Sequence, residues 1–218
     1  MSLKDLIEKI NTKLETGHYA DVIAKRPPEK PIAYTPAFTK PIAVGLRDKI
    51  KRLMGSNSRY EIENLDQLKS TPALEFMKSC KGDALLLGGV GCGKTTAAIS
   101  IVANEMEPFV KARFLTAYDL SFMIYKRDFE GLEAVEKAHI VIIDDLGTEP
   151  EGFKGKDFLA HFENLFATRH RCLRRTIITS NLTIEQIKKD YGDRFISRLR
   201  QSGQVFEANN SDMRKQEN

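Results

Sequence analysis

The sequence predicts an α/β domain in which helices flank a parallel sheet, and three features of the chain lead to this prediction. Short apolar runs of strand length recur along it, and stretches with helical periodicity separate them. Parallel strands need such crossover connections, which are usually helices. A glycine-rich loop follows the first run and leads directly into a helical segment. The expected strands lie at 83–87, within 114–120, at 139–143 and at 176–179.

The composition fits one globular domain with a modest appendage. The chain has 218 residues, of which 41% are hydrophobic, and its formal net charge of +4 does not by itself indicate a nucleic-acid-binding protein. Cys80, Cys92 and Cys172 are far apart and lack the spacing of a disulfide framework or a zinc site. No apolar run approaches the ~20 residues that cross a membrane. We therefore expect a cytoplasmic protein that does not bind membranes.

The N-terminal sequence predicts a short helix that a linker joins to the main domain. Apolar residues recur at helical spacing from Leu3 to Leu14, so residues 1–25 are expected to form an amphipathic helix, a candidate docking element for a partner. Five prolines make 26–44 an extended linker. The main domain is expected at 45–206 and a polar tail at 207–218. Within the domain, helices are expected at 46–54 and at 65–78, where Pro72 lies near a first turn or at a break.

The glycine-rich loop after the first strand has the pattern G-x-x-x-x-G-K-T, followed by a helix at 96–102. Glycines let backbone N–H groups turn toward phosphates, and the helix N-terminus adds further N–H groups and a positive dipole. Lys94 is expected to reach the β and γ phosphates, and the Thr95 hydroxyl to bind Mg²⁺. A glycine-rich turn that matches by chance is the alternative, but the strand, lysine, hydroxyl and helix are all present. The expected nucleotide-binding residues are Gly88, Gly89, Val90, Gly91, Cys92, Gly93, Lys94, Thr95 and Thr96.

Two carboxylates follow the third strand. In parallel sheets, ligands bind at the carboxyl ends of the strands, so this is the Walker B position of a P-loop NTPase. We expect Asp144 to hold Mg²⁺, directly or through water, and Asp145 to orient or deprotonate the attacking water. An ordinary acidic turn after a buried strand is the alternative, which the glycine-rich loop about 50 residues upstream makes improbable.

A polar amide follows the fourth strand. Asn181 is expected to touch the γ phosphate or the attacking water, as a sensor of the nucleotide. The alternative is that Asn181 caps a helix that begins near Thr183, a role that Asn often has. Its position beside the other two strand ends favours the sensor.

These segments together resemble the AAA+ ATPases of the DnaC, DnaI and IstB group. The resemblance covers rather more than half of the chain, in the family's order and spacing. It implies an AAA+ core without a C-terminal lid, which binds ATP and Mg²⁺ at subunit boundaries in a ring or spiral around DNA. The segments that carry it are GGVGCGKTT, FLTAYDL, AHIVIIDDLGTEP, FENLFATRH, TIITSNLTIEQI and YGDRFISRLR.

The resemblance also implies self-association with an arginine finger in trans. The family's finger lies in the segment matched by GDRFISRLR, so the candidates are Arg194, Arg198 and Arg200, with Arg198 preferred. A guanidinium there would stabilise charge that develops on the phosphates. Without this motif, such arginines would be expected on a solvated helix face.

Two further groups of residues suggest contact with DNA. The stretch 169–200 is rich in basic residues, which suits phosphate backbones. Aromatic residues between Tyr118 and Phe129 could stack on the bases of single-stranded DNA, although aromatics at helical spacing more often belong to a core.

Three functions remain open. The first is an ATP-dependent loader, whose N-terminal helix binds a DnaB-type replicative helicase and which assembles on single-stranded DNA; the tethered helix favours it. The second is an IstB-like transposition regulator, which assembles on duplex DNA and engages a transposase. The third is a stand-alone ATPase whose arginines only contact solvent.

Overall fold

The computed structural model describes residues 45–55, 60, 62–107, 109–153 and 155–208. The helix expected from Leu3 to Leu14, the linker at 26–44 and most of the tail lie outside these residues. In the part of the chain that is described, no helix is both long and apolar enough to span a membrane.

Five parallel strands form one sheet in the order β2-β3-β4-β1-β5. β1 lies near the middle, so the chain must cross two strands to reach β2 at the edge and then return through β3 and β4. The carboxyl ends of β1, β3 and β4 therefore lie next to one another. The strands are β1 (Asp83–Leu87), β2 (Ala112–Thr116), β3 (Ile140–Leu146), β4 (Arg175–Ser180) and β5 (Gly203–Glu207).

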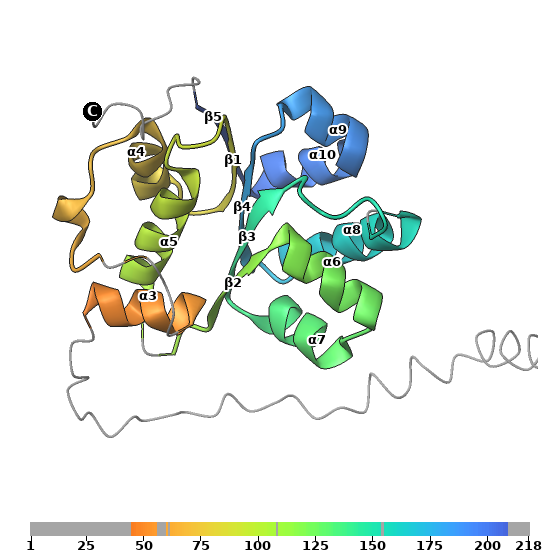
Figure 1. The fold of residues 1–218 in the computed structure, drawn as a ribbon, viewed down its shortest axis with the longest axis horizontal. Helices are drawn as coiled ribbons and strands as arrows, with labels where there is room; N and C mark the ends of the chain where they lie inside the picture. Colours follow the sequence, from red (N-terminus) through yellow and green to blue (C-terminus); the bar gives the residue numbers. More distant parts are fainter. Residues whose placement is uncertain (1–44, 56–59, 61, 108, 154, 209–218) are drawn as a thin grey trace, which may run out of the picture. The chain divides into compact units, whose positions relative to one another are not determined.

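Helices cover both faces of the sheet, as Figure 1 shows. Of the α-helices in the described residues, three lie on one face and five on the other, and this layered arrangement confirms the predicted fold class. The first face carries α3 (Leu46–Met54), α4 (Pro72–Ser79) and α5 (Lys94–Glu105). The second carries α6 (Ala117–Lys126), α7 (Phe129–Lys137), α8 (Lys156–Arg171), α9 (Ile184–Tyr191) and α10 (Asp193–Ser202).

Each face of the sheet has its own apolar core. In β1, Leu85 and Leu87 pack on the side of α6–α10, whereas Ala84 and Leu86 pack on the side of α3–α5, and all four are buried. A strand that is buried on both faces has a continuous run of apolar residues in its sequence. This is why β1 and β3 could be predicted from the sequence.

Two helices differ from their predicted bounds for local reasons. The helix expected at 65–78 is split into a short 3₁₀ turn at Leu65–Gln67 and α4, because Pro72 has no N–H and therefore starts a helix. Thr71 caps α4 by accepting a hydrogen bond from the Leu74 N–H at 3.1 Å. The segment FLTAYDL also predicts a helix that starts at or near Asp119. This helix, α6, begins at Ala117 instead, and Asp119 completes a capping box with Thr116.

The fifth strand was not predicted. β5 pairs with β1 along its whole length, and Gly203 lies so close to β1 that a Cβ there would meet the Asp83 oxygen at 2.0 Å. Only glycine, which has no Cβ, fits where the backbones of β5 and β1 come this close.

Candidate active site

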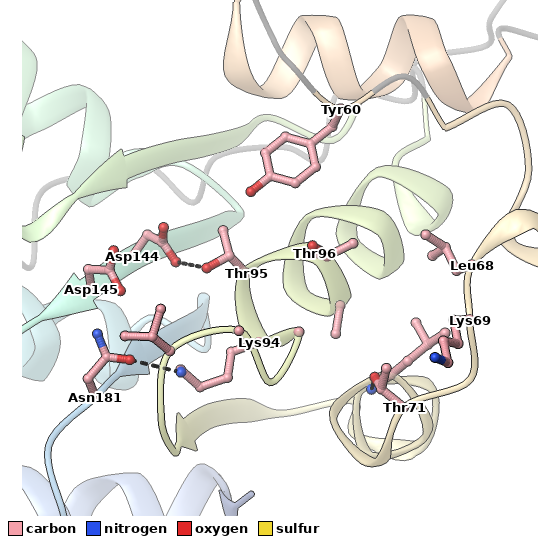
Figure 2. Close-up of a pocket in the computed structure, with 15 residues that line it drawn as sticks. Tyr60, Leu68, Lys69, Thr71, Lys94, Thr95, Thr96, Asp144, Asp145 and Asn181 are labelled. Carbon is pink, nitrogen blue, oxygen red and sulfur yellow. Dashed lines mark hydrogen bonds between the residues drawn. The ribbon is translucent and has the colours of Figure 1, made fainter. Parts of the chain in front are cut away.

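A pocket of about 400 Å³ opens at the carboxyl ends of β1, β3 and β4 (Figure 2). It brings together residues that lie far apart in the sequence. The glycine-rich loop and the start of α5 contribute Val90, Gly91, Gly93, Lys94, Thr95, Thr96 and Ala97; the ends of β3 and β4 contribute Asp144, Asp145 and Asn181.

The loop backbone requires its glycines. Gly88, Gly91 and Gly93 have φ angles of 146°, 87° and 86°, in a region that other residues rarely adopt. At Gly88 a Cβ would also meet the Ala208 Cβ at 2.7 Å. The loop leads into the N-terminus of a 12-residue helix. This combination of glycine turn and helix N-terminus is suited to bind phosphate groups.

Lys94 is the centre of the polar contacts in the loop. Only 5% of its surface is exposed, and its Nζ donates to the carbonyl oxygens of Gly88 at 2.8 Å and Gly89 at 2.9 Å. Nζ also donates to Asn181 Oδ1 at 3.0 Å, so the amide after β4 lies beside the lysine (Figure 2). The alternative in which Asn181 caps the next helix is wrong, because Thr183 is the cap of α9 and accepts from the Gln186 N–H.

The carboxylates after β3 meet the start of α5. Thr95 Oγ1 donates to Asp144 Oδ1 at 2.7 Å, and Thr179 Oγ1 donates to the same oxygen at 2.6 Å. Asp144 is 7% exposed, whereas Asp145 is more accessible. Burial raises the pKa of Asp144 above its usual value, and the two hydroxyl donors oppose this rise.

The Thr95 and Asp144 oxygens fit a magnesium ion that is bound together with a nucleotide. Mg²⁺ in nucleotide sites takes one or two protein oxygens and completes its shell with phosphates and water. No cluster of three or more His, Cys, Asp or Glu residues that could hold a metal occurs among the described residues. Two protein oxygens, from Thr95 and Asp144, suit a metal that arrives with its substrate and takes its other ligands from phosphate and water.

Residues 58–218 match the family model of the IstB-like ATP binding proteins, which is more than half of the chain. This chain belongs to the IstB-like ATP-binding family. No curated protein sequence matches this IstB-like protein.

Solved structures of replication proteins share its fold. The DnaC helicase loader is 20% identical over 67% of this chain and 96% of its own, with a TM-score of 0.55. DnaI is 18% identical over 68% of this chain and 89% of its own, with a TM-score of 0.54. Domain III of the replication initiator DnaA from Thermotoga maritima is 23% identical over 67% of this chain and 66% of its own, with a TM-score of 0.53. The chain thus has the fold of these replication proteins, with the glycine-rich loop and its helix beside the central strands.

Part of the pocket lining comes from residues that no sequence motif predicts. Tyr60, Leu68, Lys69, Thr71 and Leu74 also line the pocket, and Figure 2 shows Leu68, Lys69 and Thr71 near one another and Tyr60 apart from them. These residues precede the glycine-rich loop and belong to no recognised motif, so only the folded chain places them here.

The candidate finger arginines lie on α10. Arg194 and Arg200 are exposed, and Arg198 is partly buried with its Nη1 at 3.2 Å from Glu163 Oε1 of α8. Of the residues described, no arginine lines the pocket.

Two arginines of the basic stretch bond within the protein. Arg169 is buried, so the suggestion that it contacts DNA is wrong, and the side chain of Arg175 is only 11% exposed. Arg169 has no exposed surface, and its guanidinium donates to four carbonyl oxygens and a hydroxyl. Arg175 donates to the carbonyls of Cys80 and Gly82 and pairs with Glu105 at 2.6 Å. Both hold strands and helices together.

The aromatic residues of α6 and α7 are exposed, so the expectation that they belong to the core is wrong. Tyr118, Phe122, Tyr125 and Phe129 are 47%, 41%, 60% and 70% exposed. Tyr125 stacks on Phe153 with ring centroids 4.6 Å apart, and Lys126 Nζ lies 5.5 Å from the Phe122 ring centroid. We call these five rings the aromatic surface.

Proposed function

We propose that the IstB-like protein is an ATPase that hydrolyses ATP with Mg²⁺ and uses this cycle to load a DnaB-type replicative helicase onto DNA. The observation that carries the ATPase part is the convergence of Lys94, Thr95, Asp144, Asp145 and Asn181 on one pocket. A lysine, a hydroxyl, two carboxylates and an amide at the ends of parallel strands are the groups that phosphoryl transfer requires.

Each of these groups has a role that its position supports. The loop from Gly88 to Gly93 would surround the phosphates, and Lys94 would exchange its carbonyl contacts for the β and γ oxygens. Asn181, which accepts from Lys94, would contact the γ phosphate or the attacking water.

Thr95 and Asp144 would hold Mg²⁺, which supplies neutralisation of phosphate charge when it is bound. Asp145 is more accessible than Asp144 and lines the same pocket, so its carboxylate would orient the attacking water and take its proton. Arg198, or else Arg194, would complete the site of a neighbouring subunit.

The helicase-loading part rests on similarity of fold. The domain covers 96% of the DnaC helicase loader and 89% of DnaI. The amphipathic segment from Leu3 to Leu14 and the linker after it supply a candidate tethered element that would bind the helicase.

The aromatic surface supports contact with single-stranded DNA. Exposed rings can stack on any base, and Lys126 beside two of them can contact phosphate. Aromatic groups that are left exposed in this number usually mark a binding surface.

The family match itself favours a second candidate. An IstB-like transposition regulator would use the same ATP site but assemble on duplex DNA and engage a transposase. The family model covers residues 58–218, so the ATPase domain is compatible with either partner.

A pull-down with the replicative helicase of the same cell, in the presence of ATP, tests the choice. We would compare the wild-type chain with Leu6→Asp/Ile10→Asp, which places charges on the apolar positions of the N-terminal segment. Thr12→Asp is the matched control, since Thr12 lies off the apolar positions at helical spacing.

Helicase capture by the wild type and by Thr12→Asp, with loss in the double variant, would support the loader. Absence of capture by all three chains would contradict it. Preferential binding to duplex over single-stranded DNA would then favour the transposition regulator.

A further inference from the structure

Thr179 lies at an irregularity in the sheet beside the active site. Ile143 of β3 pairs with Ile178 of β4, and the next pair is Leu146 with Ser180. Two residues of β3, Asp144 and Asp145, therefore lie opposite the single residue Thr179. This is a β-bulge, which changes the direction of side chains on the bulged strand.

The bulge explains how both carboxylates reach the same pocket. In a regular strand, successive side chains point to opposite faces of the sheet. Asp144 and Asp145 nevertheless both line the pocket (Figure 2). Asp145 has a φ of 55°, in the left-handed region that Asp adopts more readily than most residues.

The Thr179 hydroxyl contacts both residues of the bulge. Its single proton is donated to Asp144 Oδ1 at 2.6 Å, and its oxygen accepts from the Asp145 N–H at 2.9 Å. Thr179 itself has no exposed surface and sits in a central strand between β3 and β1. These two bonds fix the side chain of Asp144 and the main chain of Asp145 at the same time.

We propose that Thr179 is a positioning residue for ATP hydrolysis, whose hydroxyl holds the two carboxylates in the arrangement that binds Mg²⁺ and activates water. This rests on the proposed ATPase function. Thr179 does not itself line the pocket, so it would act through Asp144 and Asp145.

The test compares Thr179→Val, which keeps the shape of the side chain without its hydroxyl, with Thr179→Ser, which keeps the hydroxyl. Thr176→Val is the matched control: Thr176 is also buried in β4, but its hydroxyl accepts from Arg169 at 3.0 Å and does not contact the carboxylates. Binding of a fluorescent ATP analogue with Mg²⁺ and with EDTA, turnover of ATP, and thermal unfolding are measured for each chain.

For Thr179→Val we expect kcat to fall by roughly tenfold or more and the Mg²⁺-dependent tightening of nucleotide binding to be largely lost. Affinity in EDTA should stay within about threefold of wild type, because the loop and Lys94 are intact. Thr179→Ser should restore both quantities to within about threefold of wild type. Thr176→Val should lower stability without changing either quantity.

Normal turnover and normal Mg²⁺ dependence in Thr179→Val would overturn the proposal, and so would a Thr179→Ser chain as impaired as Thr179→Val. If Thr179→Val does not fold, Thr179→Ala and Thr179→Ser form the deciding pair, since they differ by the hydroxyl alone. Failure of the wild type to bind the analogue would refute the proposed ATPase function, and this proposal with it. If the wild type binds and hydrolyses ATP and Thr179→Val does so equally well, only the role of Thr179 is refuted.

Discussion

Two buried cations illustrate how differently basic residues are used in this chain. Lys94 donates to loop carbonyls within a pocket, where a phosphate could replace them. Arg169 donates to the carbonyls of Val135, Glu136, Ala138 and Arg175, which no ligand can reach. Burial lowers the pKa of Arg169 to about 10, so it remains charged at neutral pH. The first residue serves binding and the second serves the fold.

The sequence predicts the first of these residues and not the second. Lys94 belongs to a motif whose spacing fixes its surroundings locally. Arg169 is one of several basic residues at the end of α8, and its burial depends on contacts with residues 31 to 34 positions earlier in the chain. The local sequence pattern contains no information on contacts between residues so far apart in the chain.

Arg169→Met should reduce the free energy of unfolding by about 3 kcal/mol or more, because it leaves several buried carbonyl oxygens without donors. Urea denaturation measures this change. Arg171→Met, on the exposed side of the same helix, should change it by less than about 0.5 kcal/mol. Equal effects of the two substitutions would show that the buried bonds contribute little.

At the scale of elements, the strands that hold the site are predicted better than those at the edges of the sheet. β1, β3 and β4 are apolar runs that end in motif residues, and their observed bounds lie within three residues of the expected ones. β5 has the length of β1 but no apolar run, so its pairing with β1 comes only from tertiary structure. The helix α6 was expected, but its aromatic side was expected to belong to the core and is exposed.

The arginines of helix α10 lead to a prediction about the arginine finger. Arg198→Ala should bind ATP with an affinity within about threefold of wild type, yet lower turnover by about 1,000-fold. Glu163→Gln is the control: it removes the partner of Arg198 within the chain and should leave turnover close to normal. Mixing Arg198→Ala with Lys94→Ala should restore part of the activity, since each supplies what the other lacks.

Normal turnover in Arg198→Ala, together with loss in Arg194→Ala, would assign the finger to Arg194 instead. Absence of any recovery on mixing would argue against an arginine that acts between subunits.

Helix α6 supplies the prediction about DNA. Tyr125→Ala should weaken binding to a single-stranded oligonucleotide by about tenfold, because a stacked base contributes roughly 1–3 kcal/mol. Fluorescence anisotropy at fixed salt measures the affinity. Phe109→Ala removes an exposed ring from outside the aromatic surface and should have no effect. Unchanged affinity in Tyr125→Ala would remove the aromatic surface from the DNA-binding account.

At the scale of the whole molecule, the sequence motifs account for the nucleotide pocket but not for the other surfaces. The P-loop, the carboxylates and the amide lie together at the carboxyl ends of the parallel strands. This convergence was predicted from the positions of the strand ends alone. The part of the pocket lined by Tyr60, Leu68 and Lys69 was not predicted, because it depends on segments that come together only in the fold. Exposure of the rings from Tyr118 to Phe129 was only the less favoured alternative, because helical spacing does not distinguish a core face from a binding face, and the contact with Phe153 comes only from the fold.

ATP turnover in the presence of Mg²⁺, measured together with ATP binding by calorimetry, tests the central claim most directly. The wild type should bind and hydrolyse ATP. Lys94→Ala should bind it about 100-fold more weakly, and Asp145→Asn should bind normally but hydrolyse it about 100-fold more slowly. Lys81→Ala, an exposed lysine outside the pocket, should match the wild type. A wild type that does not bind ATP, or a Lys94→Ala chain that binds and hydrolyses it normally, would contradict the assignment of this pocket as the ATPase site.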